Sequence, residues 1–160
     1  MAENQFNNFF GTKLSVQEVV LEVITFMKGD PERKYKITIG TDSKLYGKTD
    51  ADFVTAIVVH KVGNGARYFW RRLELKNFHT LRDRIIKEVM FSLDVSRGVL
   101  DFLKEKRAPD FDFEVHVDIG ENGPTKVMIQ ELTAIIRANN FEVKTKPDSY
   151  SASWVADRHT

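Results

Sequence analysis

Two aspartates follow apolar, strand-like stretches of the chain. Asp42 lies in ITIGTDSK at residues 37–44, and Asp118 lies in VHVDIGEN at residues 115–122. Two carboxylates placed side by side raise one another's pKa unless a cation lies between them. The chain has no cysteine, so a metal would be held by oxygen or imidazole, which favours Mg²⁺ or Mn²⁺. Because these ions hold phosphate oxygens and activate water, the two aspartates predict a metal site for phosphate chemistry.

Further carboxylates can reach the same place. Asp157 lies in SYSASWVADRHT, where small residues would let a helix approach the sheet closely. Glu88 comes three residues after Ile85 and therefore borders the apolar stripe of a long helix. Asp83 borders the opposite edge of that stripe and is the weaker candidate. His159, next but one to Asp157, is expected either to move a proton or to be a surface imidazole.

Phosphate contacts are expected from polar and basic side chains near these carboxylates. Ser43 and Lys44 follow Asp42 directly and would either bind a substrate phosphate or close a turn. Lys144 and Lys146 alternate on the last strand-like stretch, near the crevice where the aspartates are expected.

Each acidic residue also has an ordinary interpretation. Asp42 could cap a turn, since Asp-Ser commonly begins one. Asp118 could begin a calcium loop, because Asn122 and Gly123 match the fifth and sixth positions, but Ile129 stands where the twelfth position needs glutamate. Glu88 could be a surface partner of Arg84, four residues earlier.

The composition is that of one compact globular domain. The chain has 160 residues, of which 42% are hydrophobic and 29% charged. Its 24 basic and 23 acidic side chains leave a formal net charge of +1, so any basic surface that attracts a polyanion must be local. The start of the chain has no basic region followed by an apolar stretch, and no run of about 18 apolar residues occurs, which indicates a cytoplasmic protein.

The elements that must position these residues alternate between helices and strands. Hydrophobic spacing, caps and turn residues predict, in order, a helix from Ser15 to about residue 28, strands at 35–41, 53–62 and 66–75, a helix at 80–106, a strand at 111–117, a helix at 126–138, a strand at 141–146 and a final helix within 147–160. The first three strands can pair as hairpins, whereas the fourth and fifth each arrive by a helical crossover and should be parallel to their neighbours.

The expected fold is therefore α/β. It is a mixed five-stranded sheet in the order 3-2-1-4-5, with strand 2 antiparallel, helices on both faces, and an N-terminal extension at residues 1–30 that carries one helix. In such a sheet the crevice at the carboxyl ends of strands one and four is the expected ligand site. This is where Asp42 and Asp118 would meet.

The stretches IGTDSK, HVDIGENGPTK and KPDSYSASWVADRHT together resemble the ribonuclease H-like superfamily and, within it, the YkuK-like proteins of bacteria. That resemblance implies the strand and helix order given above. It also implies a set of Asp, Glu, Asp and Asp that binds two divalent ions and cuts a phosphodiester bond by activated water. On this chain the matching positions are Asp42, Glu88, Asp118 and Asp157.

The resemblance therefore predicts a nuclease that uses two Mg²⁺ or Mn²⁺ ions and acts on RNA, DNA or a hybrid. One alternative is a binding module for nucleic acid or protein that keeps the fold without turnover. Another is phosphoryl transfer, because DIGENG also resembles the phosphate loops of sugar kinases and actin-like ATPases. Those proteins need two such domains, and this chain has the length of one.

Overall fold

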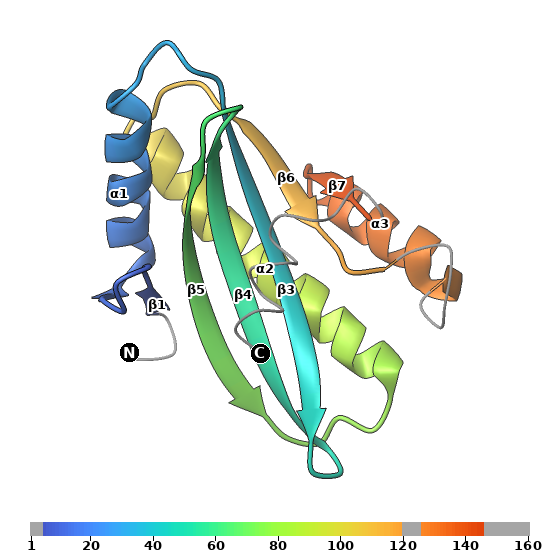
Figure 1. Cartoon of the computed structure of the whole chain (residues 1–160). Helices are drawn as coiled ribbons and strands as arrows, with labels where there is room; N and C mark the ends of the chain where they lie inside the picture. Colours follow the sequence, from blue (N-terminus) through green and yellow to red (C-terminus); the bar gives the residue numbers. More distant parts are fainter. Residues whose placement is uncertain (1–4, 120–125, 146–160) are drawn as a thin grey trace.

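The computed structural model describes residues 5–119 and 126–145, and its centre is one mixed sheet (Figure 1). The sheet has seven strands in the order β2-β1-β5-β4-β3-β6-β7. The strands are β1 (Phe6–Asn7), β2 (Lys13–Leu14), β3 (Tyr35–Tyr46), β4 (Asp50–Lys61), β5 (Ala66–Leu75), β6 (Asp112–His116) and β7 (Glu142–Lys144). The helices are α1 (Val16–Lys28), α2 (Leu81–Glu105) and α3 (Ile129–Ala138), the last preceded by the 3₁₀ turn η2 (Lys126–Met128).

The long strands β3, β4 and β5 form an antiparallel meander, as their alternating patterns predict. Glycines permit the two turns, because Gly47 has φ +62° and Gly63 and Gly65 have φ +78° and +99°. These left-handed values cost little only without a Cβ atom. Strands β6 and β7 then add in parallel on the far side of β3, each after a helical crossover.

The expected count of five strands is wrong, because two short strands extend the sheet beyond β5. β1 pairs with β2 and with β5, and the side-chain amide of Asn7 donates to the carbonyl of Trp70 at 3.3 Å. Phe6 is fully buried beneath this edge. A strand of two residues leaves no alternating pattern in the sequence, so only its contacts with β5 reveal it.

Local signals set the helix boundaries. Ser15 caps α1 with a complete capping box, since its hydroxyl accepts from the Glu18 backbone at 3.1 Å and the Glu18 carboxylate accepts from the Ser15 backbone at 3.0 Å. Thr80 caps α2 through its hydroxyl, which accepts from the backbone N–H of Asp83 at 3.0 Å. Both predicted helix starts are confirmed.

All three described helices pack on one face of the sheet. The odd-numbered residues of β3 and β6, such as Ile37, Ile39 and Val115, point to this face and form the core with α1, α2 and α3. In Figure 1, α2 runs behind the long strands, with α1 and α3 at its two sides. Helices on both faces were expected, but the described residues carry helices on one face alone, and the final helix expected within 147–160 lies outside them. Within the described ranges, no helix is both long and apolar enough to cross a membrane.

Candidate functional site

The site forms where β3 runs past the end of β6. His116, the last residue of β6, pairs with Gly40, whereas β3 continues to Tyr46 in register with β4. Asp42 therefore lies two residues beyond the end of the β3–β6 ladder. The sequence-based strand that stopped at residue 41 was too short, because pairing with β4 keeps the backbone extended as far as the hairpin turn. Asp42 thus lies within a strand and not at its carboxyl end.

Alternation along β3 sends the neighbours of Asp42 toward α2. Thr41 is buried, and its Oγ1 lies 2.9 Å from the Thr55 Oγ1 and 2.7 Å from the Ser92 Oγ. Ser43 lies on the same side of the strand and donates a hydrogen bond from its hydroxyl to the Glu88 carboxylate. These two hydroxyls hold β3 against α2 at the level of Asp42.

Glu88 is the most unusual of the candidate residues, because only 4% of it is exposed. Burial raises the pKa of its carboxyl well above the ordinary value, and the nearby charges of Asp42 and Asp118 raise it further. The hydrogen bond from Ser43 and the charge of Arg84 act in the opposite direction and are outweighed. Such a carboxylate, buried beside two others, is costly to ionise unless a cation compensates the charge.

Asp42 and Asp118 are thus near enough to Glu88 for their charges to act on its carboxyl, and both aspartates are half-buried. The sequence-based interpretation of Glu88 as a surface partner of Arg84 is wrong, because the side chain is buried against β3. Within residues 5–119 and 126–145, no group of three or more His, Asp or Glu side chains is close enough to hold a metal ion. Asp42, Glu88 and Asp118 therefore do not form a metal site by themselves in the described part of the chain.

Of the remaining candidate residues, some lie outside the described part of the chain and the others are lysines on β3 and β7. Asp157, His159 and Lys146 lie outside the described residues. Lys44 is exposed on β3. Lys144 lies on β7, with its ammonium 3.7 Å from the Glu114 carboxylate.

Sequence reasoning missed the polar face of β6. Glu114 and His116 are both buried, alternate with apolar residues in FEVHVD, and lie on the same side of β6. The ammonium of Lys36 on β3 lies 3.0 Å from Glu114. The period-two alternation in this stretch was the signal that could have placed Glu114 and His116 on one face.

The comparisons with known proteins agree with this architecture. Residues 18–160 match the family described as ribonuclease H-like. The chain belongs to this ribonuclease H-like family. A relative named uncharacterized protein YkuK, from Bacillus subtilis (strain 168), is 35% identical over 171 aligned residues, which cover 97% of this chain and 96% of that protein. No solved structure is a significant match to the chain. The resemblance to ribonuclease H-like and YkuK-like proteins is thereby confirmed.

Proposed function

We propose that the protein is a ribonuclease H-like nuclease that hydrolyses phosphodiester bonds with the help of Mg²⁺ or Mn²⁺. The observation that carries the proposal is the buried Glu88 carboxylate, held by Ser43 and raised in pKa by Asp42 and Asp118. The carboxylates of Asp42 on β3, Glu88 on α2 and Asp118 after β6 supply the oxygen donors that these ions prefer, and the charges of both aspartates act on Glu88. Membership of the family supports nucleic acid as the substrate.

In this proposal Asp42 and Asp118 hold the divalent ions, and Asp157 completes the second of two sites. Bound ions would stabilise charge on the phosphate and lower the pKa of the attacking water. Glu88 would accept a hydrogen bond from that water and orient it toward the phosphorus. Ser43 is then a positioning residue, because its hydroxyl holds the Glu88 carboxylate in one direction.

Basic side chains would hold the substrate. Lys44 is exposed beside the carboxylates, and Lys144 presents its ammonium on the neighbouring strand β7. Lys146 and His159 are proposed for the same task, with His159 also able to protonate the leaving oxygen. Because the net charge is only +1, nucleic acid would be attracted by such local groups and not by the whole molecule.

A calorimetric titration of Mn²⁺ tests the metal site. The wild-type protein should show saturable binding that is lost in Asp42→Asn. The matched control is Asp94→Asn, which makes the same chemical change at an exposed position of α2. Binding that survives in Asp42→Asn, or that is lost equally in Asp94→Asn, would contradict the assignment.

Cleavage tests the reaction itself. Labelled single-stranded, duplex and hybrid oligonucleotides are incubated with the same three proteins, with Mn²⁺ and with EDTA. Metal-dependent cleavage by the wild type and Asp94→Asn, but not by Asp42→Asn, supports the nuclease and names its substrate. Metal binding without cleavage of any strand would instead favour a binding module on the ribonuclease H-like fold.

A further inference from the structure

A second polar site lies on the face of the sheet opposite α1 and α2. A pocket of about 630 Å³ lies between the start of β3, strands β6 and β7, and the turn from β4 to β5. Its lining residues include none of the three carboxylates described above. The volume is within the range of about 300–1,000 Å³ that is typical of small-molecule sites.

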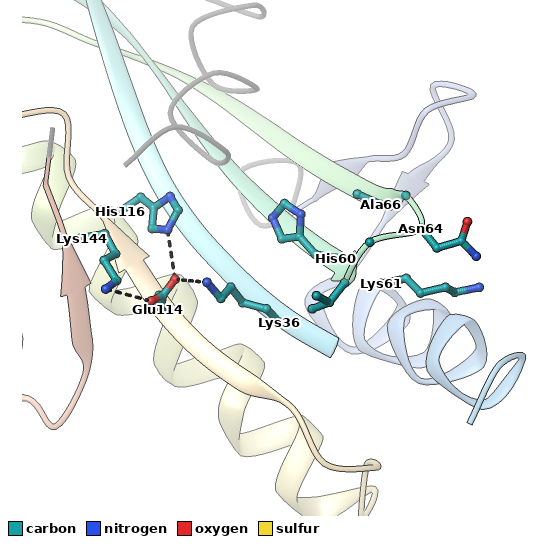
Figure 2. A pocket seen from close by; sticks show the side chains of 11 residues that line it. Lys36, His60, Lys61, Asn64, Ala66, Glu114, His116 and Lys144 are labelled. Atoms are coloured by element: carbon teal, nitrogen blue, oxygen red, sulfur yellow. Dashed lines mark hydrogen bonds and ion pairs between the residues drawn. The ribbon is translucent and has the colours of Figure 1, made fainter. Parts of the chain in front are cut away.

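The pocket carries an excess of positive charge. Lys36, Lys61 and Lys144 line it, and Glu114 is the only acidic residue among the lining residues. Glu114 is 5% exposed, and the ammoniums of Lys36 and Lys144 lie 3.0 Å and 3.7 Å from its carboxylate. Figure 2 shows these three side chains gathered on one side of the pocket, with His116 above them.

Among the described residues, two lysines around one carboxylate leave an excess of one positive charge at the pocket wall. Burial raises the pKa of Glu114, but the hydrogen bonds from Lys36 and His116 and the charge of Lys36 outweigh it and hold the carboxyl ionised. Lys61 also lines the pocket, but its ammonium lies 4.9 Å from the centre of the Phe26 ring on α1 and 3.8 Å from Asp30, so its charge is directed away from Glu114. Each ammonium carries three N–H donors, so a ligand oxygen can bind beside Glu114 without displacing it. This arrangement suits an anion such as a phosphate.

His116 adds a hydrogen-bond acceptor that needs a donor from the ligand. Its side chain is 3% exposed, and its Nε2 lies 3.5 Å from the Glu114 carboxylate. An ionised carboxylate only accepts hydrogen bonds, so the nitrogen that faces it is the one that carries hydrogen in a neutral imidazole. Nδ1 is then an acceptor, and it is buried without a hydrogen-bond partner among the described residues. A buried polar atom without a partner is costly, so a ligand with a hydroxyl group would be favoured there.

We propose that this pocket binds a ribose phosphate, with phosphate oxygens on Lys36 and Lys144 and a ribose hydroxyl donating to the Nδ1 of His116. The ligand is a ribonucleotide, present either as a free mononucleotide or as the phosphorylated end of an RNA strand. The 2′-hydroxyl is the group that distinguishes RNA from DNA at a given site. The proposal goes beyond the nuclease assignment, since it uses none of the three carboxylates, and it gives Lys144, which is also proposed for the nuclease substrate, a second role.

Calorimetry in EDTA tests the proposal on the wild-type protein. The probes are adenosine 5′-monophosphate, its 2′-deoxy analogue and inorganic phosphate. Adenosine 5′-monophosphate should bind about two- to tenfold more tightly than the deoxy analogue, the difference expected for one hydrogen bond. Equal binding of the two nucleotides would overturn the ribose contact, and no saturable binding of any probe would overturn the site. Because no divalent cation is present, these outcomes are separate from the success or failure of the proposed nuclease.

Variants locate the binding. Lys36→Gln and Lys144→Gln should each weaken the nucleotide by about tenfold or more, because each removes a charged donor. Lys104→Gln, at an exposed position of α2, is the matched control and should leave the affinity unchanged. His116→Phe should keep phosphate binding and abolish the preference for ribose. If the affinity for the nucleotide is unchanged in both Lys36→Gln and Lys144→Gln, the assignment of the ligand to this pocket is refuted.

A final comparison distinguishes the two sources of the ligand. A short RNA with a 5′-phosphate is titrated beside the same RNA without it and beside the free nucleotide. Tighter binding of the phosphorylated RNA assigns the pocket to a strand end, whereas tighter binding of the free nucleotide assigns it to a small ligand. A 5′-phosphate that changes nothing, together with no binding of the free nucleotide, would refute a phosphate site.

Discussion

Replacing Ser43 with alanine tests whether the Glu88 carboxylate depends on the sheet for its position. The Ser43 hydroxyl donates to Glu88, and Glu88 is almost wholly buried on α2. This hydrogen bond favours the ionised carboxylate, so its loss should raise the pKa of Glu88 further above the ordinary value. The variant should therefore lose more stability at high pH, where Glu88 is ionised, than at low pH.

The size of the effect follows from the type of hydrogen bond. A bond to a charged group contributes about 1.5–3 kcal/mol, and one between neutral groups about 0.5–1.5 kcal/mol. Ser43→Ala should therefore lower the free energy of unfolding by about 2 kcal/mol at high pH and by about 1 kcal/mol at low pH. With a urea m-value of about 2 kcal/mol/M, the larger loss shifts the midpoint by about 1 M.

Urea unfolding of the metal-free protein at pH 5 and pH 8.5 measures this difference. Ser96→Ala is the matched control, because the Ser96 hydroxyl is fully buried on α2 without a hydrogen-bond partner among the described residues. Its removal should be neutral or slightly stabilising at both pH values. In a Glu88→Gln background, Ser43→Ala should lose its pH dependence. The reasoning is refuted by a loss in Ser43→Ala that is the same at both pH values, or by a pH dependence that persists unchanged in the Glu88→Gln background.

Two further predictions concern the same core. The pKa of Glu88 is higher in the folded protein than in the unfolded chain, so the folded state binds more protons at pH values between the two pKa values. The free energy of unfolding should therefore fall as pH rises from about 4.3. Urea titrations in EDTA should show this fall in the wild type and not in Glu88→Gln, and the same pH profile in both proteins would contradict the assigned burial. Leu93→Ala, at a position on α2 that is 1% exposed, should cost about 2–5 kcal/mol through the cavity it leaves. Manganese calorimetry below its melting temperature should show unchanged affinity, and a large loss of affinity would mean that the site depends on core packing beyond its own contacts.

Local chemistry made much of the fold predictable. The capping box of Ser15 and Glu18 and the left-handed glycines of the β4–β5 turn act within a few residues of themselves, so their signals can be recognised in the sequence. The two-residue strands β1 and β2 had no such signal. They are held by long-range contacts, such as the amide of Asn7 on the carbonyl of Trp70, which no local pattern contains.

The candidate site was predictable to a similar degree. Strand patterns brought Asp42 and Asp118 to neighbouring strands, and the helical spacing put Glu88 at the border of an apolar stripe. The border position did not say whether Glu88 faces solvent or protein. The rotation of α2 against β3 decides this, and it is set by contacts such as Thr41 with Ser92.

The sequence by itself therefore determined which elements form, how the central strands alternate, and which carboxylates are candidates for metal binding. Only the tertiary structure decided that Ser43 meets Glu88 across 45 residues of chain, and that Lys36, Glu114, His116 and Lys144 share one pocket. The physical reason is that alternation and capping act between neighbours along the chain. Desolvation and charge act through space, so the protonation of Glu88 and the charge of the pocket depend on what folding places beside them.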